Sequence, residues 1–251
     1  MRMAIPLILP LLGLALAAAL WAVATLLLAA DTPILANFAP LEALRALSGL
    51  AINPLMWSHI GVSLQRVAIG LVVALAIGVP LGILTGVSRA FAHTTTPLFQ
   101  FLRMISPLSW MPIAVMVLGV GDAPVYFLLA FAAVWPILLN TAAGVAQLDR
   151  NWLMLARSLS ATRSETIFRV VVPGIVAHIL SGVRLAIGII WIILVPAEML
   201  GVSAGLGYFI LDARDRLAYP DLMAAILIIG ALGFALDYAA RWLYQHWLHK
   251  R

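Results

Sequence analysis

Six long, continuously apolar stretches are the feature that most limits what this chain can fold into. They cover residues 4–30, 67–87, 99–120, 123–145, 174–197 and 222–244. A helix needs about 20 mostly apolar residues to cross the hydrocarbon core of a bilayer. Strands of a membrane barrel alternate between apolar and polar residues, whereas these stretches do not. The sequence therefore predicts an all-α polytopic membrane protein with about six transmembrane helices.

The composition excludes a soluble domain and several kinds of chemistry. Of the 251 residues, 64% are hydrophobic and 10% are charged, whereas soluble domains carry about 25% charged residues. Basic residues are not interleaved with aromatic ones as on a nucleic-acid-binding surface, so we expect no nucleic-acid partner. The chain has no cysteine, which excludes disulfides, thiolate metal sites and cysteine nucleophiles.

The Lys and Arg residues in the loops, in the tails and near the ends of the spans indicate the orientation in the membrane. If the N-terminus is inside, the inner side holds nine of them, Arg2, Arg89, Arg150, Arg157, Arg163, Arg169, Arg241, Lys250 and Arg251, and the outer side holds three, Arg45, Arg214 and Arg216. Cytoplasmic loops carry the excess of Lys and Arg, so we expect both termini in the cytoplasm. A cleaved signal peptide is the alternative for residues 4–30, but that stretch exceeds the roughly 7–15 apolar residues of a signal peptide.

We expect one compact membrane domain with four parts. These are an N-terminal transmembrane helix (1–30), an outer loop (31–66), a core (67–244) that includes an inner segment (149–173), and a basic tail (245–251). In the outer loop, leucines recur at helical spacing after Pro40, which predicts a short amphipathic helix. Arg66, at the end of this loop, is interpreted as an interfacial arginine whose charge reaches the membrane surface.

The inner segment is basic and amphipathic. Trp152, Leu155, Ala156 and Leu159 share one face of a helix. The stretch 160–162 is expected to break that helix, and Ser164 is expected to cap the next one. Such a helix could lie among the headgroups of membrane lipid or dock in a groove of another protein.

The same segment resembles the coupling motif of ABC importer permeases, which reads E-A-A, three residues, G, nine residues, I-x-L-P. Met154, Leu155 and Ala156 align with E-A-A, Ser160 with the glycine, and Pro173 with the final proline. Five further motifs occur in the order typical of the nitrate, sulfonate, taurine and bicarbonate branch: R-M-I-S-P-L-S-W-M-P-I at 103–113, W-P-I-L-L-N-T at 135–141, G-V-R-L-A at 182–186, P-A-E-M-L at 196–200 and G-L-G-Y at 205–208.

This resemblance implies the type I ABC importer permease fold in a bacterial inner membrane, and a transport subunit rather than an enzyme. It implies a second permease copy, expected to form a homodimer, and separate ABC ATPase subunits that bind ATP and Mg²⁺. A periplasmic or lipid-anchored substrate-binding protein would deliver a small anion or sulfonate. The chain has no G-x-x-x-x-G-K-S/T loop, so no cofactor is expected on it. ATPase docking is expected at Trp152, Leu155, Ala156, Arg157, Leu159 and Ser160.

Polar side chains within the spans are the candidates for the translocation pathway, because charged groups in a membrane usually face a cavity or a partner. They are Arg103, Ser106, Trp110, Asn140, Arg184, Trp191 and Glu198. Arg103 or Arg184 would supply positive potential for an anion, and Glu198 is expected at a gate or an interface. The alternative is structural: each arginine pairs with a carboxylate or carbonyl, and the tryptophans only pack.

Two other function classes fit the sequence less well. An intramembrane hydrolase would need a motif such as His-Glu-x-x-His or Gly-x-Ser-x-Gly, and neither occurs, so no catalytic or metal-binding residue is expected. A secondary transporter or channel that works without an ATPase would not need the inner amphipathic segment, and no paired inverted repeat is visible.

Overall fold

The described part of the chain folds into helices joined by short loops. The computed structural model describes residues 5–30 and 32–248, and no strand occurs in these ranges. The predicted all-α fold is therefore confirmed. The terminal charges of Arg2, Lys250 and Arg251, which enter the orientation count, lie outside the described residues.

The chain divides into two compact units. One unit runs to Ile60 and includes Phe209–Ala231, and the other consists of Gly61–Tyr208 and the residues from Leu232 onward. The first unit holds α1 (Ile5–Ala29), the 3-10 helix η1 (Pro33–Phe38) and α2 (Pro40–Ala51). The amphipathic helix predicted to begin at Pro40 is confirmed as α2, and proline suits its first turn because that position needs no N–H donor.

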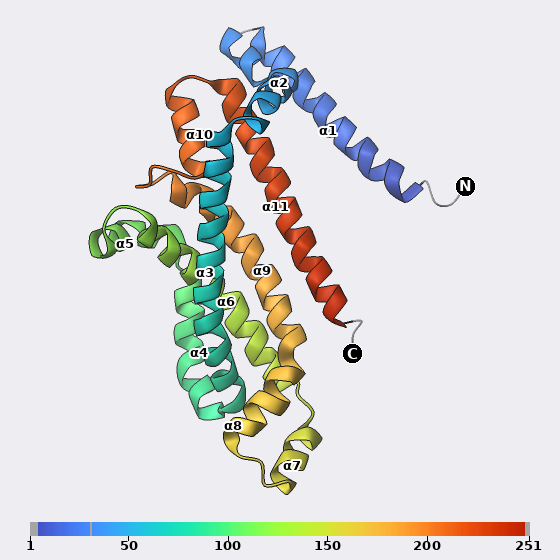
Figure 1. Ribbon diagram of the computed structural model, residues 1–251, viewed down its shortest axis with the longest axis vertical. Helices are drawn as coiled ribbons and strands as arrows, with labels where there is room; N and C mark the ends of the chain where they lie inside the picture. The colour runs from blue at the N-terminus through green and yellow to red at the C-terminus, as the bar shows by residue number, and fades with distance from the viewer. Residues whose placement is uncertain (1–4, 31, 249–251) are drawn as a thin grey trace. The chain divides into compact units, whose positions relative to one another are not determined.

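The second unit holds the helices that carry the candidate site residues. Their bounds are α4 (Arg89–Met104), the 3-10 helix η2 (Pro107–Trp110), α5 (Met111–Leu118), α6 (Asp122–Ala146), α7 (Arg150–Ser158), α8 (Arg163–Thr166), the π-helical turn η3 (Ile167–Val171) and α9 (Val172–Glu198). Three helices have residues in both units: α3 (Pro54–Val87), α10 (Leu206–Asp215) and α11 (Tyr219–Leu248). Figure 1 labels most of these elements.

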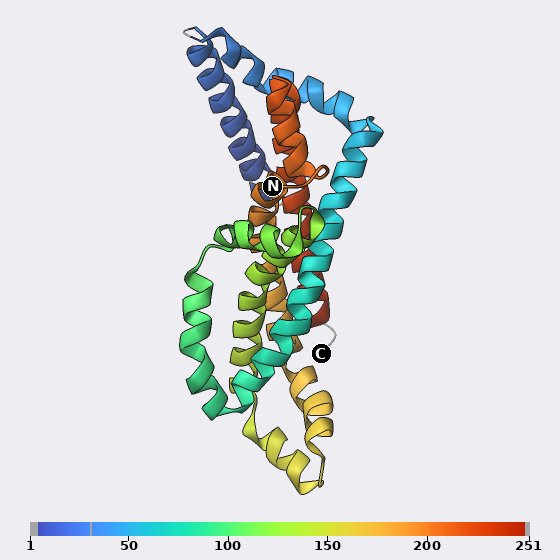
Figure 2. The same cartoon turned by 90° about the vertical axis from the view of Figure 1, so that its left-hand side faces the viewer.

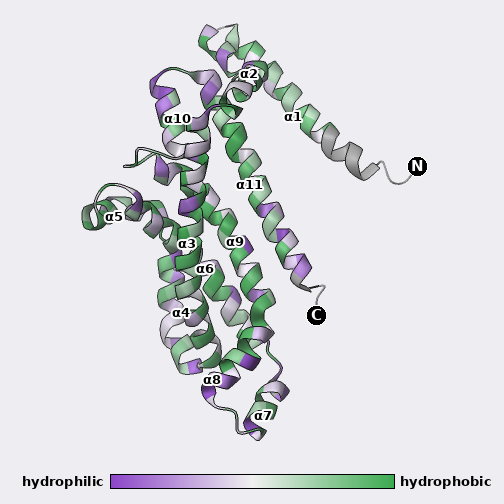
Figure 3. Ribbon diagram, in the orientation of Figure 1, coloured by the Kyte–Doolittle hydropathy of each residue, from purple (hydrophilic) through white to green (hydrophobic). Residues whose placement is uncertain are grey.

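The long helices match the predicted spans. Among the described residues, five helical stretches are long and apolar enough to cross a membrane: Leu12–Ala29, Pro54–Val87, Asp122–Ala146, Arg163–Glu198 and Tyr219–His246. Figure 3 shows that hydrophobic residues predominate along α6 and α9 and that hydrophilic residues gather at α8. The fifth predicted span is longer than expected, because α8 and η3 continue into α9 without a break.

The third predicted span, residues 99–120, is not one continuous helix. It covers the end of α4 and the stretch Pro107–Leu118. The whole of α4 and this stretch meet at an angle of 87° and together could make a sixth span. Figure 2 shows this turn between α4 and α5. The predicted span is broken just before Pro107: α4 ends at Met104, and Ile105 is extended. Pro107 lacks the N–H that would continue the helix.

The core of the second unit forms where α6 packs between α3 and α9. Leu128, Ile137 and Leu194 are among its fully buried side chains, and Figures 1 and 2 both show α6 and α9 side by side. Glycines allow the close approach of α3 to α6, because a Cβ at Gly82 would lie 2.6 Å from the Cβ of Thr141. Small residues let spanning helices pack closely in membranes.

Candidate functional site

The predicted coupling segment is a helix with a defined end. Asp149 caps α7 by accepting a hydrogen bond from the N–H of Asn151 at 2.9 Å. At the other end, Ser160 has φ +55°, its N–H donates to the Arg157 carbonyl, and the Ala161 N–H donates to the Ala156 carbonyl. This pair of bonds is the Schellman arrangement, in which glycine normally takes the left-handed position. Ser160 therefore has the left-handed backbone conformation that favours glycine, at the position that is glycine in the coupling motif.

The helix that follows the break is capped by Thr162, and the predicted cap at Ser164 is wrong. Thr162 and Glu165 form a capping box: the Thr162 hydroxyl accepts from the Glu165 N–H at 3.2 Å, and the Thr162 N–H donates to the Glu165 carboxylate at 2.9 Å. Thr162 is extended, as an N-cap must be, whereas Ser164 lies inside α8. From Arg163 to Glu198 the chain is continuously helical, so the end of α7 is joined to α9 by one short turn.

The expected docking residues differ in exposure. Trp152, Leu155 and Leu159 are 59%, 51% and 73% exposed, and Arg157 and Ser160 are exposed as well. Ala156 is only 6% exposed, so its side chain faces the protein. The exposed apolar strip on α7 therefore consists of Trp152, Leu155 and Leu159.

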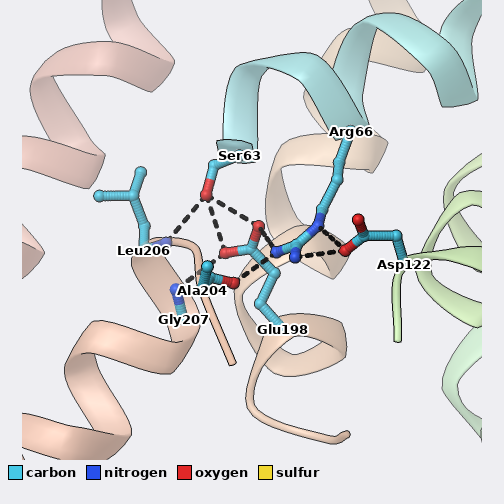
Figure 4. Close-up of polar contacts among 7 residues, drawn as sticks. All are labelled: Ser63, Arg66, Asp122, Glu198, Ala204, Leu206 and Gly207. Carbon is cyan, nitrogen blue, oxygen red and sulfur yellow. Dashed lines mark hydrogen bonds and ion pairs between the residues drawn. The ribbon is translucent and has the colours of Figure 1, made fainter. Parts of the chain in front are cut away.

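Arg66 and Glu198 belong to a buried polar cluster, which Figure 4 draws. Nη1 of Arg66 lies 2.7 Å from Oε1 of Glu198 and also donates to the Ala204 carbonyl. The Glu198 carboxylate further accepts from the Ser63 hydroxyl, at 2.8 and 2.9 Å, and from the Gly207 N–H at 2.9 Å. Arg66 is 2% exposed, so its interpretation as an interfacial arginine is wrong: a carboxylate inside the protein neutralises the charge.

Arg66 also reaches Asp122, the first residue of α6. Its Nε lies 3.0 Å from Oδ1 of Asp122, and the Asp122 side chain is half exposed. A cavity of about 570 Å³ adjoins this pair and is lined by the loops around Gly121 and Gly201. The arginine thus links a buried carboxylate on one side to a half-exposed carboxylate at a cavity on the other.

Arg184 is paired with a carboxylate of α11. Its Nε lies 3.4 Å from Oδ1 of Asp237, while Oδ2 of Asp237 accepts two N–H groups of Arg241. Arg184 and Asp237 line a cavity of about 550 Å³, together with Ser181, Leu185, Gly188, Ile189, Ile192 and Tyr244. We call it the Arg184 cavity.

Arg103 lines a different cavity, of about 330 Å³. The other residues around it are Ile105, Pro107, Ala132, Trp135, Pro136, Leu139, Asn140, Leu185, Ile189 and Ile193. We call it the Arg103 cavity. Arg103 has no hydrogen bond or ion pair to any residue that the structure describes. Two of the predicted pathway residues, Arg103 and Asn140, therefore meet at one cavity.

The remaining predicted residues lie elsewhere. Trp191 of α9 packs against Gly233 of α11. A Cβ added at Gly233 would lie 2.5 Å from the indole nitrogen of Trp191. Trp110 is 5.7 Å from the ring of Phe131, measured between centroids, and Ser106 is exposed. Sequence reasoning missed Ser63, Asp122 and Asp237. Asp237 could have been found as a charged side chain within an apolar span. The structural alternative, in which each arginine pairs with a carboxylate or carbonyl, describes its contact with Arg184.

The described residues contain no group of three His, Cys, Asp or Glu side chains that could hold a metal ion.

Comparison with known proteins gives consistent matches. Residues 78–249 match the family described as binding-protein-dependent transport system inner membrane component. The bicarbonate transport system permease protein CmpB of Synechococcus elongatus is 41% identical, over 77% of this chain and 69% of the relative. The nitrate import permease protein NrtB of Leptolyngbya laminosa is 37% identical (73% and 65%), and the taurine transport system permease protein TauC of Escherichia coli is 30% identical (88% and 81%).

Solved structures of ABC transporters share the fold. An inward-facing structure of the MetNI methionine ABC transporter has a chain that matches with a TM-score of 0.65 at 14% identity, over 77% of this chain and 98% of that one. A chain of an amino acid ABC transporter crystallised with histidines matches with a TM-score of 0.60 at 16% identity, over 82% and 98%. At these identities the likeness concerns the fold, which is the predicted type I importer permease fold.

Proposed function

The chain belongs to the family of binding-protein-dependent transport system inner membrane components, and from this premise we propose that it is the permease subunit of an ATP-driven importer for a small anion. It is a multi-pass membrane protein with the fold of ABC importer permeases. We place it in a bacterial inner membrane with both termini in the cytoplasm. The proposal includes a second permease copy, separate ATPase subunits that bind ATP and Mg²⁺, and a substrate-binding protein on the outer side.

The observation that carries the proposal is the exposed apolar strip of α7 and its connection to α9. Trp152 and Leu155 of α7 and Leu159, which caps its C-terminal end, stand exposed on one face, in a segment whose polar residues suit the cytoplasm. Such a face is suited to a groove in a partner protein. Because helix continues without a break from Arg163 to Glu198, a push on α7 would be transmitted along α9. Rigid-body motion of this kind switches transporters between two packings.

We propose that the strip docks on the ATPase and that Arg157 and Ser160, exposed beside it, complete the contact. Ala156 would act differently: its small, buried side chain lets α7 pack against the rest of the protein. For the passage itself we propose Arg103, Asn140 and Arg184 as residues that substrate meets. Glu198, Trp191 and Trp110 would form the frame, and Ser106 would lie at the helix break beside Arg103.

Two observations support an anionic substrate. The relatives named above are described as permeases for bicarbonate, nitrate and taurine. Both proposed passage cavities are lined by an arginine, and the Arg103 cavity has no carboxylate among its lining residues. A cavity with positive charge attracts anions.

Co-expression with the ATPase and binding-protein subunits of an importer of this family tests the proposal. We expect the tagged permease to bring down the ATPase. Proteoliposomes with the complex should take up nitrate, bicarbonate or taurine only when ATP and the binding protein are present. Uptake by the purified permease alone, driven by an ion gradient, would instead favour a secondary transporter.

A further inference from the structure

Arg103 differs from the other arginines that lie within or at the edge of the spans. Arg66 is bound to two carboxylates, and Arg184 is bound to one. Arg103 contacts neither a carboxylate nor a carbonyl among the described residues. An ionisable group at membrane depth without a protein partner is costly, and such residues usually mark the path of a substrate or an ion.

The Arg103 cavity lies near the middle of two of the helices that line it. It is lined on α6 by residues from Ala132 to Asn140, which lie in the middle of a helix of 25 residues. At 1.5 Å per residue they lie about 15–27 Å from the start of α6. On α9 the lining residues Leu185 and Ile193 lie about 20–32 Å from the start of the helix. Both helices are long enough to span, so the cavity lies level with the middle of two candidate spans.

The polar groups of the Arg103 cavity are suited to an oxyanion. The Arg103 guanidinium carries five N–H donors and no acceptor. Trp135 also lines the cavity, but its indole nitrogen is fully buried, so the tryptophan contributes the face of its ring. The Asn140 amide donates to the Pro136 carbonyl at 2.8 Å and keeps a second N–H. Hydrogen bonds from a guanidinium to an ionised oxygen are stronger than neutral ones.

The size of the cavity restricts the ligand. Its volume of about 330 Å³ is at the lower end of the roughly 300–1,000 Å³ typical of ligand pockets. Apart from Arg103 and Asn140, apolar side chains such as Ile105, Leu139 and Ile193 surround it. This combination fits an anion of a few heavy atoms and leaves no carboxylate to attract a cation.

The Arg184 cavity adjoins the Arg103 cavity, because Leu185 and Ile189 line both. It reaches further toward the inner ends of the helices, where Ser181 of α9 and Tyr244 of α11 lie. Arg184 is held by a single contact of 3.4 Å, whereas two N–H groups of Arg241 hold Asp237. An anion can therefore bind Arg184 while Asp237 keeps its second arginine.

We propose that the permease itself binds a small oxyanion at two successive stations, first at Arg103 and then at Arg184, and that Leu185 and Ile189 separate the two. This inference rests on the proposed importer function and adds a substrate-binding site within the permease. Arg103 is the cation of the first station, assisted by the amide of Asn140, and the ring of Trp135 forms part of the wall. At the second station the anion binds Arg184 and displaces Asp237 from it. Movement of Leu185 and Ile189 on α9 connects the Arg103 cavity to the Arg184 cavity.

The first test measures anion binding to the complex of permease and ATPase without the binding protein, in lipid nanodiscs. Sodium nitrate, sodium bicarbonate and taurine are titrated by calorimetry. We expect at least one of them to bind. Arg103→Gln should raise its Kd about tenfold or more, because a charge-assisted interaction is lost, and Arg103→Lys should raise it less. Arg89→Gln is the matched control, because Arg89 begins the same helix, is exposed and lines neither cavity.

The second test separates binding from passage. Leu185→Trp should lower ATP-driven uptake about tenfold and raise the Kd by a smaller factor, because the larger side chain fills the space between the cavities. Arg184→Gln should likewise lower uptake more than it changes binding. Equal Kd and uptake for wild type and Arg103→Gln would overturn the inference, as would a wild-type complex that binds none of the three probes.

The two proposals fail in different ways. The wild type should associate with the ATPase and show ATP hydrolysis that the binding protein stimulates, and Arg103→Gln should keep the association. If the wild type has both properties and Arg103→Gln transports normally, only the two-station inference is wrong. If the wild type neither associates with an ATPase nor shows ATP-dependent uptake, the importer function is wrong.

Discussion

Arg66 and Glu198 form an ion pair inside the protein, with 2.7 Å between Nη1 and Oε1 and side chains that are 3% and 0% exposed. The pair joins α3 to the end of α9. Removing one member of a buried pair leaves the other charge without compensation, which typically costs about 3–5 kcal/mol. We therefore expect Glu198→Ala to lower the thermal unfolding temperature of the purified permease markedly. Glu198→Gln should lower it less, because the amide can still accept hydrogen bonds from Ser63 and Gly207.

The matched control for this pair is Glu42→Gln. Glu42 and Arg45 form an ion pair on α2 whose side chains are 38% and 66% exposed. Exposed pairs contribute about 0–1 kcal/mol, so this variant should unfold near the wild-type temperature. Similar shifts for Glu198→Ala and Glu42→Gln would mean that the buried pair does not stabilise the fold.

Gly205 is the residue that lets the loop before α10 close over the ion pair. Its φ is +116°, and a Cβ there would lie 2.5 Å from both Nη1 of Arg66 and Oε1 of Glu198. A side chain is strained at this φ, so Gly205→Ala should destabilise the protein in the thermal assay. Gly61→Ala is the control, because a Cβ there meets nothing within 4 Å and alanine favours a helix. Equal stability of the two variants would contradict the tight closure.

Gly82 allows α3 to approach α6. A Cβ there would lie 2.6 Å from the Cβ of Thr141 and 2.7 Å from the Leu138 carbonyl. Gly82→Leu should force the helices apart, at a cost of about 1–3 kcal/mol or more, and lower the yield of folded protein in size-exclusion chromatography. Gly230→Leu on α11, where a Cβ has open space, should not lower it. If both elute as folded protein, the close contact of α3 and α6 is dispensable.

The spans could be predicted because they depend on local composition. Long apolar runs need a helix in lipid, so the helices α1, α6, α9 and α11 fall near their predicted bounds. The start of α3 could not be predicted in this way. It begins at Pro54 instead of residue 67, because polar residues such as Ser63 and Arg66 suggested a loop. They are helical and buried, and their partners lie far along the chain.

The site was predictable only as a set of candidates. Hydrophobic periodicity places residues on helix faces but does not show which helices meet, and Ser63 and Glu198 are 135 residues apart. The sequence therefore left open whether Arg103 or Arg184 is paired. The structure distinguishes them, because Asp237 of α11 lies beside Arg184 and no described carboxylate binds Arg103.

The exposed strip of α7 gives the sharpest test of ATPase coupling. Leu155 is 51% exposed and lies between Trp152 and Leu159 on the strip, so Leu155→Glu should insert a charge into the docked face without disturbing the fold. We expect ATP hydrolysis stimulated by the binding protein to fall about tenfold or more, since a buried, unpaired charge at an interface is costly. The thermal unfolding temperature should stay near that of the wild type.

Met154→Glu is the matched control for this charge. Met154 is the preceding residue, is 56% exposed, and points away from the strip by helical geometry. It also occupies the position that is glutamate in the coupling motif of the family. The same charge one residue earlier should therefore leave stimulated hydrolysis within about twofold of the wild type, because it does not enter the apolar contact. Equal loss in both variants would indicate general sensitivity to negative charge near α7, and normal hydrolysis in Leu155→Glu would exclude the strip as the docking surface.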